Sequence, residues 1–152
     1  MKRHSVVLLS FLPMIIGYTL SANTLTCHRG LQGHVYQVNG NQMPSPEEKP
    51  VVPKGIRTTL YIYDLTNISQ VSRQGDSPFY TSIHSKLVKT IETDENGYFR
   101  IKLKPGMYSL FIKKDDLFYS SQFDGKNNIH PVEVSPGKFT EVVFHANYNA
   151  VY

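Results

Sequence analysis

The chain contains very little cysteine and no concentrated positive charge. Cys27 is the only cysteine among 152 residues, so no disulfide can form within the chain. The 16 Lys and Arg residues face 12 Asp and Glu residues and are scattered along the sequence. Because no basic cluster is interleaved with aromatic residues, the sequence does not predict a surface that binds nucleic acid.

The signatures of common active sites are also missing. No G-x-S-x-G, P-loop or G-x-G-x-x-G pattern occurs. Four histidines show no metal-ligand spacing, and they are His28, His34, His84 and His145. The sequence therefore predicts no enzyme, no cofactor and no metal site.

The one long apolar run lies at the start of the chain. Lys2 and Arg3 precede the run of residues 5–20, which is the pattern of a secretory signal peptide. Pro13 and Gly17 interrupt this run, and it falls short of the ~20 residues that a membrane span needs. We predict a signal peptide over residues 1–26, an anchor segment over 27–29 and a single domain over 30–152.

Cys27 stands at the junction between the signal peptide and the domain. An odd cysteine in an exported protein requires a particular explanation, and Leu25-Thr26-Cys27 resembles the lipid-accepting motif of bacterial lipoproteins. The match is imperfect, since Leu25 is two residues before the cysteine instead of three and Thr26 is larger than usual. We predict lipidation at Cys27 and a place in the outer membrane or periplasm. The alternative is cleavage after Ala22, which would release a soluble periplasmic or secreted protein.

Residues 93–112 carry the clearest strand pattern. Asp94, Asn96 and Gly97 predict a tight turn, after which apolar and polar residues alternate with the two-residue period of a half-buried strand. The apolar positions are Phe99, Ile101 and Leu103 before Pro105-Gly106, and Tyr108, Leu110 and Ile112 after it. Since Pro-Gly fits the centre of a type II turn, we predict a β-hairpin here.

The rest of the domain predicts five further strands. They cover residues 31–36, 56–65, 79–93, 129–135 and 137–148, with a second hairpin around Pro136-Gly137. Residues 43–53 contain four prolines and predict a surface loop. Residues 67–78 predict an insertion loop, and residues 115–128 a connector. The expected fold class is all-β, with seven strands.

These residues resemble the carboxypeptidase regulatory-like domain family. The pattern consists of Thr93, Asp94, Asn96, Gly97, Phe99, Leu103, Pro105, Gly106, Tyr108 and Leu110, with weaker support from Gly33, Val35, Gly40, Pro44, Gly55, Leu60 and Ile62. The resemblance covers roughly residues 30–148 and implies a seven-stranded Greek-key β-sandwich of the transthyretin-like (prealbumin-like) type. The chain departs from the family in residues 45–54 and in the insertion after the second strand.

The family implies a domain that accompanies a catalytic domain without cutting peptides. His130 and Glu133 match the H-x-x-E spacing of zinc carboxypeptidases, but residues three apart in a strand point to opposite faces, and a catalytic zinc needs three protein ligands. Transthyretin-like hydroxyisourate hydrolases, which do catalyse a reaction, end in Tyr-Arg-Gly-Ser. This chain ends in Ala150-Val151-Tyr152, which removes most of the case for a hydrolase.

The expected function is a non-enzymatic binding or assembly module of the cell envelope, with an envelope protein or a glycan as its partner. The alternative is a periplasmic small-molecule-binding protein or hydrolase on the same fold.

Outward aromatic residues are the candidate binding residues. They are Tyr61, Tyr63, Tyr98 and Tyr119, with Phe118 and Phe123 beside them in the connector. An exposed patch of this kind would suit a glycan or a protein partner. The alternative is that these rings pair across strands and pack beneath the insertion loops.

Overall fold

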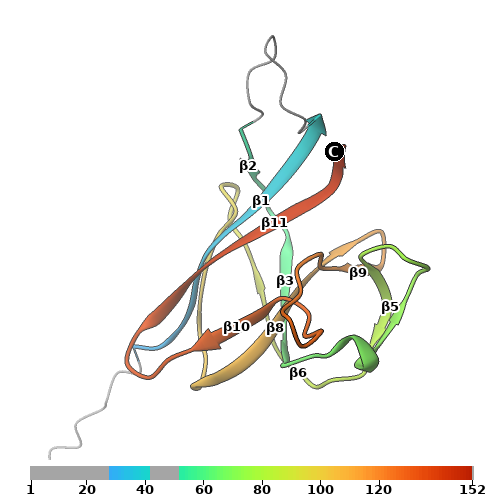
Figure 1. The fold of residues 1–152 in the computed structure, drawn as a ribbon. Helices are drawn as coiled ribbons and strands as arrows, with labels where there is room; N and C mark the ends of the chain where they lie inside the picture. The colour runs from blue at the N-terminus through green and yellow to red at the C-terminus, as the bar shows by residue number, and fades with distance from the viewer. Residues whose placement is uncertain (1–27, 42–51, 152) are drawn as a thin grey trace, which may run out of the picture.

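The protein folds as two facing β-sheets (Figure 1). The structure is a computed structural model, which describes residues 28–41 and 52–151. Cys27, the signal peptide and most of the proline-rich loop lie outside the described residues. Within them the chain forms eleven strands and one short 3-10 helix, η1 (Ile68–Gln70). The described part contains no helix of the length and hydropathy that a membrane span requires. The expectation of an all-β sandwich is confirmed.

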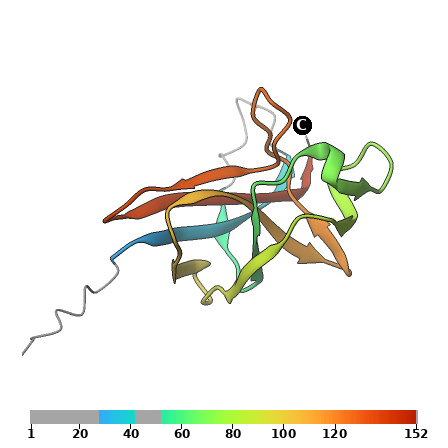
Figure 2. The same cartoon turned by 90° about the horizontal axis from the view of Figure 1, so that it is seen from below.

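The first sheet is built around the longest contact between two strands. β1 (Gly30–Asn41) runs parallel to β11 (Phe139–Val151) along nearly its whole length. Its other edge is shared by β7 (Tyr98–Lys102), which pairs with the first half, and β2 (Lys54–Gly55), which pairs near Tyr36. Figure 2 shows β1 and β11 side by side in one layer, with most of the second sheet beneath them.

The second sheet is wider and is centred on β3 and β8. Its order is β4 (Val71–Arg73), β5 (Phe79–Ile83), β9 (Leu117–Tyr119), β8 (Gly106–Lys114), β3 (Thr59–Asp64) and β6 (Leu87–Glu92). β10 (Pro131–Val134) pairs with the start of β8. β6 therefore forms one edge of this sheet, close to β7 of the first sheet.

The core lies between the sheets and follows the predicted alternation. Leu31 and Val35 of β1 are fully buried, as are Leu60 and Ile62 of β3, because the inward positions of both strands are apolar. The turn before β7 also forms as predicted. Gly97 adopts φ +79°, and its amide donates to the Asp94 carbonyl oxygen at 3.0 Å. A Cβ at Gly97 would lie 2.2 Å from a carbonyl oxygen of β1, so this position requires glycine.

The two predicted hairpins are wrong in their pairing. β7 pairs with β1 in the first sheet, whereas β8 pairs with β3 in the second. The chain thus crosses from one sheet to the other at Pro105-Gly106, and it crosses again at Pro136-Gly137, since β10 lies in the second sheet and β11 in the first. Alternation determines which face of a strand is buried but not which neighbour it pairs with.

Residues 79–93 form two strands instead of the one expected. β5 and β6 lie on different sides of the β8–β3 pair, and residues 84–86 link them. Two backbone bonds hold the link, from the His84 amide to the Gln70 carbonyl at 2.8 Å and from the Asp64 amide to the Lys86 carbonyl at 3.0 Å. Together with the short strands β2, β4 and β9, this division raises the seven expected strands to eleven.

A second, smaller core covers the outer side of the wider sheet. Its buried members are Tyr63, Tyr80, Phe111 and Ile129. In Figure 1 the segments that carry β5 and β9 curve into a ring beside β8. Asn67 ties this region together, because its side-chain amide donates to the Lys126 carbonyl oxygen at 2.8 Å and to the Asn128 side chain at 3.2 Å.

Candidate functional site

The four candidate tyrosines do not form one exposed patch. Tyr63 and Tyr119 are only 7% and 1% exposed. Tyr61 and Tyr63 meet Phe118 edge-on, with ring centroids 5.4 Å and 5.9 Å apart. The expectation of exposure is therefore wrong for Tyr63 and Tyr119. Tyr61 and Tyr63 pack into the second core, as the alternative expected, whereas Tyr119 lies in the main core and contacts Tyr148 of β11. Tyr63 is covered because the segment of β4 and β5 folds back over the outer face of its own sheet.

Tyr98 lies on the outer face of the other sheet, in a row of four rings. Tyr98 contacts His34 at 5.3 Å between ring centroids, and His34 stacks on Tyr36 at 5.5 Å. Tyr36 in turn stacks on His145 at 6.2 Å. We call these four residues the aromatic row. It spans β7, β1 and β11, whose outward positions lie opposite one another in the register.

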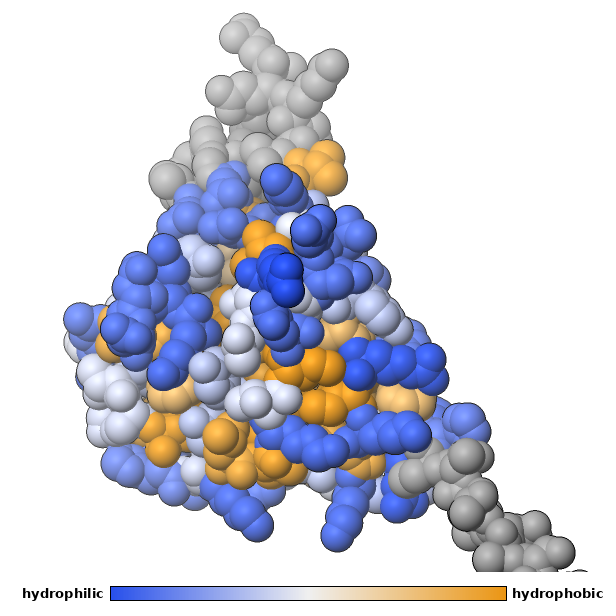
Figure 3. Space-filling view, turned by 180° about the vertical axis from the view of Figure 1, so that it is seen from behind, coloured by the Kyte–Doolittle hydropathy of each residue, from blue (hydrophilic) through white to orange (hydrophobic). Residues whose placement is uncertain are grey.

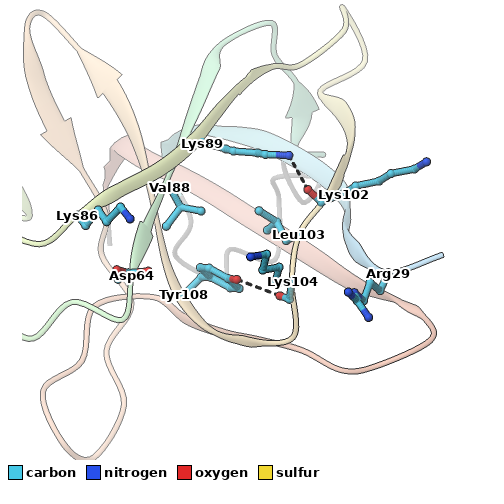
Figure 4. Close-up of a pocket in the computed structure, with 9 residues that line it drawn as sticks. All are labelled: Arg29, Asp64, Lys86, Val88, Lys89, Lys102, Leu103, Lys104 and Tyr108. Carbon is cyan, nitrogen blue, oxygen red and sulfur yellow. Dashed lines mark hydrogen bonds between the residues drawn. The ribbon is translucent and has the colours of Figure 1, made fainter. Parts of the chain in front are cut away.

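A pocket of about 540 Å³ opens at the seam between the two sheets. We call it the basic pocket. Its lining residues come from five places in the chain, and they are Arg29, Asp64, Lys86, Val88, Lys89, Lys102, Leu103, Lys104 and Tyr108. Figure 4 shows them around the space between β6, the end of β7 and the start of β8. The pocket exists because the edge strands of the two sheets, β6 and β7, do not pair with each other.

The charge of the pocket is strongly unbalanced. Five cationic side chains line it, against the single carboxylate of Asp64. The whole chain, by contrast, has 16 basic and 12 acidic residues. Several like charges around one concave site create a local potential that attracts anions. These lysines are dispersed in the sequence, so sequence analysis missed the site. The one feature of the sequence that pointed to the pocket is the alternation at residues 102–104, which places Lys102 and Lys104 outward on either side of the buried Leu103.

Two hydrogen bonds hold the rim of the pocket. The ammonium group of Lys89 reaches across from β6 and donates to the Lys102 carbonyl oxygen at 2.9 Å. The Tyr108 hydroxyl donates to the Lys104 carbonyl oxygen at 2.9 Å. Figure 4 shows both contacts, and it also shows that the Lys102 side chain extends away from the other lining residues. The remaining cations, Lys86, Lys104 and Arg29, stand at three different sides of the space.

Arg29 carries an unusual feature for a surface cation. Its Nε atom is buried and has no hydrogen-bond partner in the described part of the chain. A buried donor without an acceptor costs about 1–3 kcal/mol, so native proteins rarely leave one without a purpose. Arg29 is also one of the residues that line the basic pocket.

The floor of the pocket is apolar. Leu103 and Tyr108 are 5% and 7% exposed and belong to the main core, and Val88 packs against them. Burial raises the pKa of the Tyr108 hydroxyl, and the nearby Asp64 carboxylate raises it further. Tyr108 therefore stays protonated at neutral pH.

Figure 3 shows the back of the molecule, with hydrophobic residues in the middle of the face and hydrophilic side chains around them.

The remaining candidates for chemistry lie apart from one another. His130 is buried and stacks on Phe144 at 4.6 Å between ring centroids, whereas Glu133 is exposed on β10. No group of three His, Cys, Asp or Glu side chains in the described ranges is arranged to hold a metal ion. The residues that line the basic pocket include no Ser, Cys or His. The pocket thus offers positive charge and apolar contact to a ligand.

Comparison with known family models, curated proteins and solved structures gives no match to this chain.

Proposed function

We propose that this protein is a non-enzymatic binding module of the cell envelope, with the basic pocket as its binding site. The observation that carries the proposal is a preformed pocket with an apolar floor that five cationic residues and a single carboxylate line. Preformed concave sites with apolar walls and a few placed polar groups are the usual form of ligand sites. An anionic group on a ligand or envelope protein would enter this pocket.

Capture from envelope extracts tests this proposal. The full chain serves as bait beside an Arg29→Gln variant, which keeps a polar side chain and removes one charge and the buried Nε donor. The proposal expects a reproducible partner or ligand that the wild type retains and the variant loses. Capture of nothing reproducible, or equal capture by both baits, would count against it.

The proposed fold is a transthyretin-like Greek-key sandwich, as in the carboxypeptidase regulatory-like domains. Support comes from the positions that carry the resemblance. Phe99, Leu103, Tyr108 and Leu110 are all buried in the main core. Phe99 lies in β7, Leu103 in the link after it, and Tyr108 and Leu110 in β8 of the other sheet, so the resemblance falls on residues that join the two layers.

Export and lipid anchoring through Cys27 belong to the same proposal. The intact mass of the protein, purified separately from membrane and soluble envelope fractions, tests them. A mass that begins at Cys27 and includes acyl chains is expected. A mass that begins at Asn23 with a free thiol would replace the anchored module by a diffusible one.

A soluble periplasmic small-molecule-binding protein, or a hydrolase, remains the second candidate. The pocket volume of about 540 Å³ favours the binder, since it lies within the range of sites for organic ligands. Thermal-shift screening against purine-derived and glycan ligands tests this candidate. It loses support if no compound raises the melting temperature.

The aromatic row is the surface that a glycan partner would use. Tyr98 is 37% exposed and His145 is exposed, so the row is accessible along part of its length. Tyr98→Ala, compared with Tyr98→Phe, tests this contact on an array of envelope glycans. Selective loss of signal with alanine is expected, and equal signals would exclude the row.

A further inference from the structure

We infer that the basic pocket binds an anionic amphiphile, with a phosphate group on the basic rim and an apolar portion on the floor. This inference rests on the proposed role of the pocket as a binding site and names the class of its occupant. It draws on the charge of the rim, the composition of the floor and the position of Arg29.

The rim is suited to phosphate because it presents several cations from different directions. Lys86 comes from the segment before β6, Lys104 from the link between β7 and β8, and Arg29 from the residue before β1. Arg29 brings a guanidinium group, whose Nε atom is buried and lacks an acceptor. Guanidinium and ammonium groups form charge-assisted hydrogen bonds with phosphate oxygens.

The floor distinguishes an amphiphile from a free ion. Inorganic phosphate is fully hydrated and would gain nothing from contact with Val88, Leu103 and Tyr108. The volume of about 540 Å³ also exceeds what a small ion needs and suits a ligand with an organic body. Removal of apolar ligand surface from water supplies affinity in addition to the charge contacts.

The position of the pocket favours a membrane phospholipid as the source of this amphiphile. Arg29 lies two residues after Cys27, so its Cα can be no more than about 7 Å from the Cα of that cysteine, and a lipid there would hold this side of the pocket near the membrane. A basic site so close to a membrane surface would be exposed to anionic headgroups.

Binding of a short-chain lipid in solution tests the inference. The probe is dihexanoyl-phosphatidylglycerol below its micellar concentration, with dihexanoyl-phosphatidylcholine and inorganic phosphate as comparison ligands, and affinity is measured by calorimetry. We expect the full chain to bind the anionic lipid, with affinity that falls as salt is added. The zwitterionic lipid and inorganic phosphate are expected to bind far more weakly.

Two matched double variants assign the binding to the pocket. Lys86→Gln with Lys104→Gln removes two pocket charges, whereas Lys126→Gln with Lys138→Gln removes two exposed charges elsewhere. All four lysines are exposed, so both variants are expected to fold, which circular dichroism checks. The pocket variant should lose about thirtyfold in affinity. The control variant should keep the wild-type value.

Several outcomes would overturn the inference. Equal losses in both variants would mean that only net charge matters. Equal affinity for inorganic phosphate would mean that the floor contributes nothing. Binding to vesicles of phosphatidylcholine and phosphatidylglycerol in equal parts, without binding of the short-chain lipid, would mean attraction to a charged surface and not occupation of the pocket.

If the short-chain lipid binds, binding to the same vesicles identifies the source of the ligand. Binding of the protein to the vesicles would mean that it takes a lipid from the membrane. No binding to the vesicles would mean that it takes a free amphiphile. Either result supports the pocket. Because these measurements are made in solution, they are independent of whether Cys27 is lipidated, so failure of the anchor and failure of the pocket are distinguishable.

Discussion

His130 should make the protein lose stability in mild acid. Its side chain is 4% exposed and stacks on Phe144 in the core. Burial, with a smaller contribution from the proximity of His145, lowers the pKa of the His130 imidazole from 6.5 to about 4. The native state therefore holds this imidazole neutral over a range in which the unfolded chain protonates it.

The sign and size of the effect follow from this difference. Since the unfolded state binds the proton more tightly, the stability contribution is fully present above pH 6.5 and is lost as the pH falls through about 4. A difference of roughly 2.5 pKa units corresponds to about 3 kcal/mol, at 1.36 kcal/mol for each unit. A loss of that size is a substantial part of the free energy of unfolding, which is roughly 5–15 kcal/mol for a typical globular domain.

The assay is urea unfolding followed by circular dichroism between neutral pH and about pH 4, for the wild type and His130→Phe. The phenyl ring keeps a planar group against Phe144 and cannot be protonated. The difference in unfolding free energy between the two proteins should shift by about 3 kcal/mol across this range. Subtraction cancels the carboxylates that titrate in both, including Asp124, whose pKa is lowered by hydrogen bonds from Asn128. Parallel curves for the two proteins would refute the reasoning.

Other substitutions test the packing of the fold. Gly97→Ala places a Cβ 2.2 Å from a backbone oxygen at φ +79°, whereas Gly137→Ala at φ +76° meets nothing within 4 Å. Urea unfolding should show a loss of about 1–2 kcal/mol for Gly137→Ala and a clearly larger one for Gly97→Ala; equal losses would contradict the close approach. Tyr63→Ala empties a buried position of the second core and should cost about 3–5 kcal/mol, while Tyr98→Ala at an exposed position should cost less than about 1 kcal/mol. Thermal melting measures this pair, and similar melting temperatures would argue against the second core. Asn67→Ala removes the cap of η1 and the bonds to the neighbouring loop, so hydrogen exchange of residues 67–84 and 120–130 should accelerate while that of β1 does not. Unchanged exchange would show that the side chain does not hold the two segments together.

Local patterns predicted the parts of the fold that depend on neighbouring residues. The turn at Asp94 to Gly97 and the inward faces of β7 and β8 follow from turn chemistry and from a two-residue period, both of which are visible within a few positions. The division of residues 79–93 into β5 and β6 was not visible, because apolar residues occur on both faces of that segment. One of its halves contributes to the second core and the other to the edge beside the basic pocket.

The sequence by itself determined the fold class, the buried faces and the two places at which Pro-Gly redirects the chain, because these depend on backbone sterics and on alternation. Only the tertiary structure decided that each Pro-Gly connects different sheets, that Tyr63 and Tyr119 are covered, and that Arg29, Lys86 and Lys104 meet at one pocket. Strand pairing and charge clustering join residues that are far apart in the chain. The packing of the two layers determines which strands pair and which charges meet, and no short stretch of sequence specifies that packing.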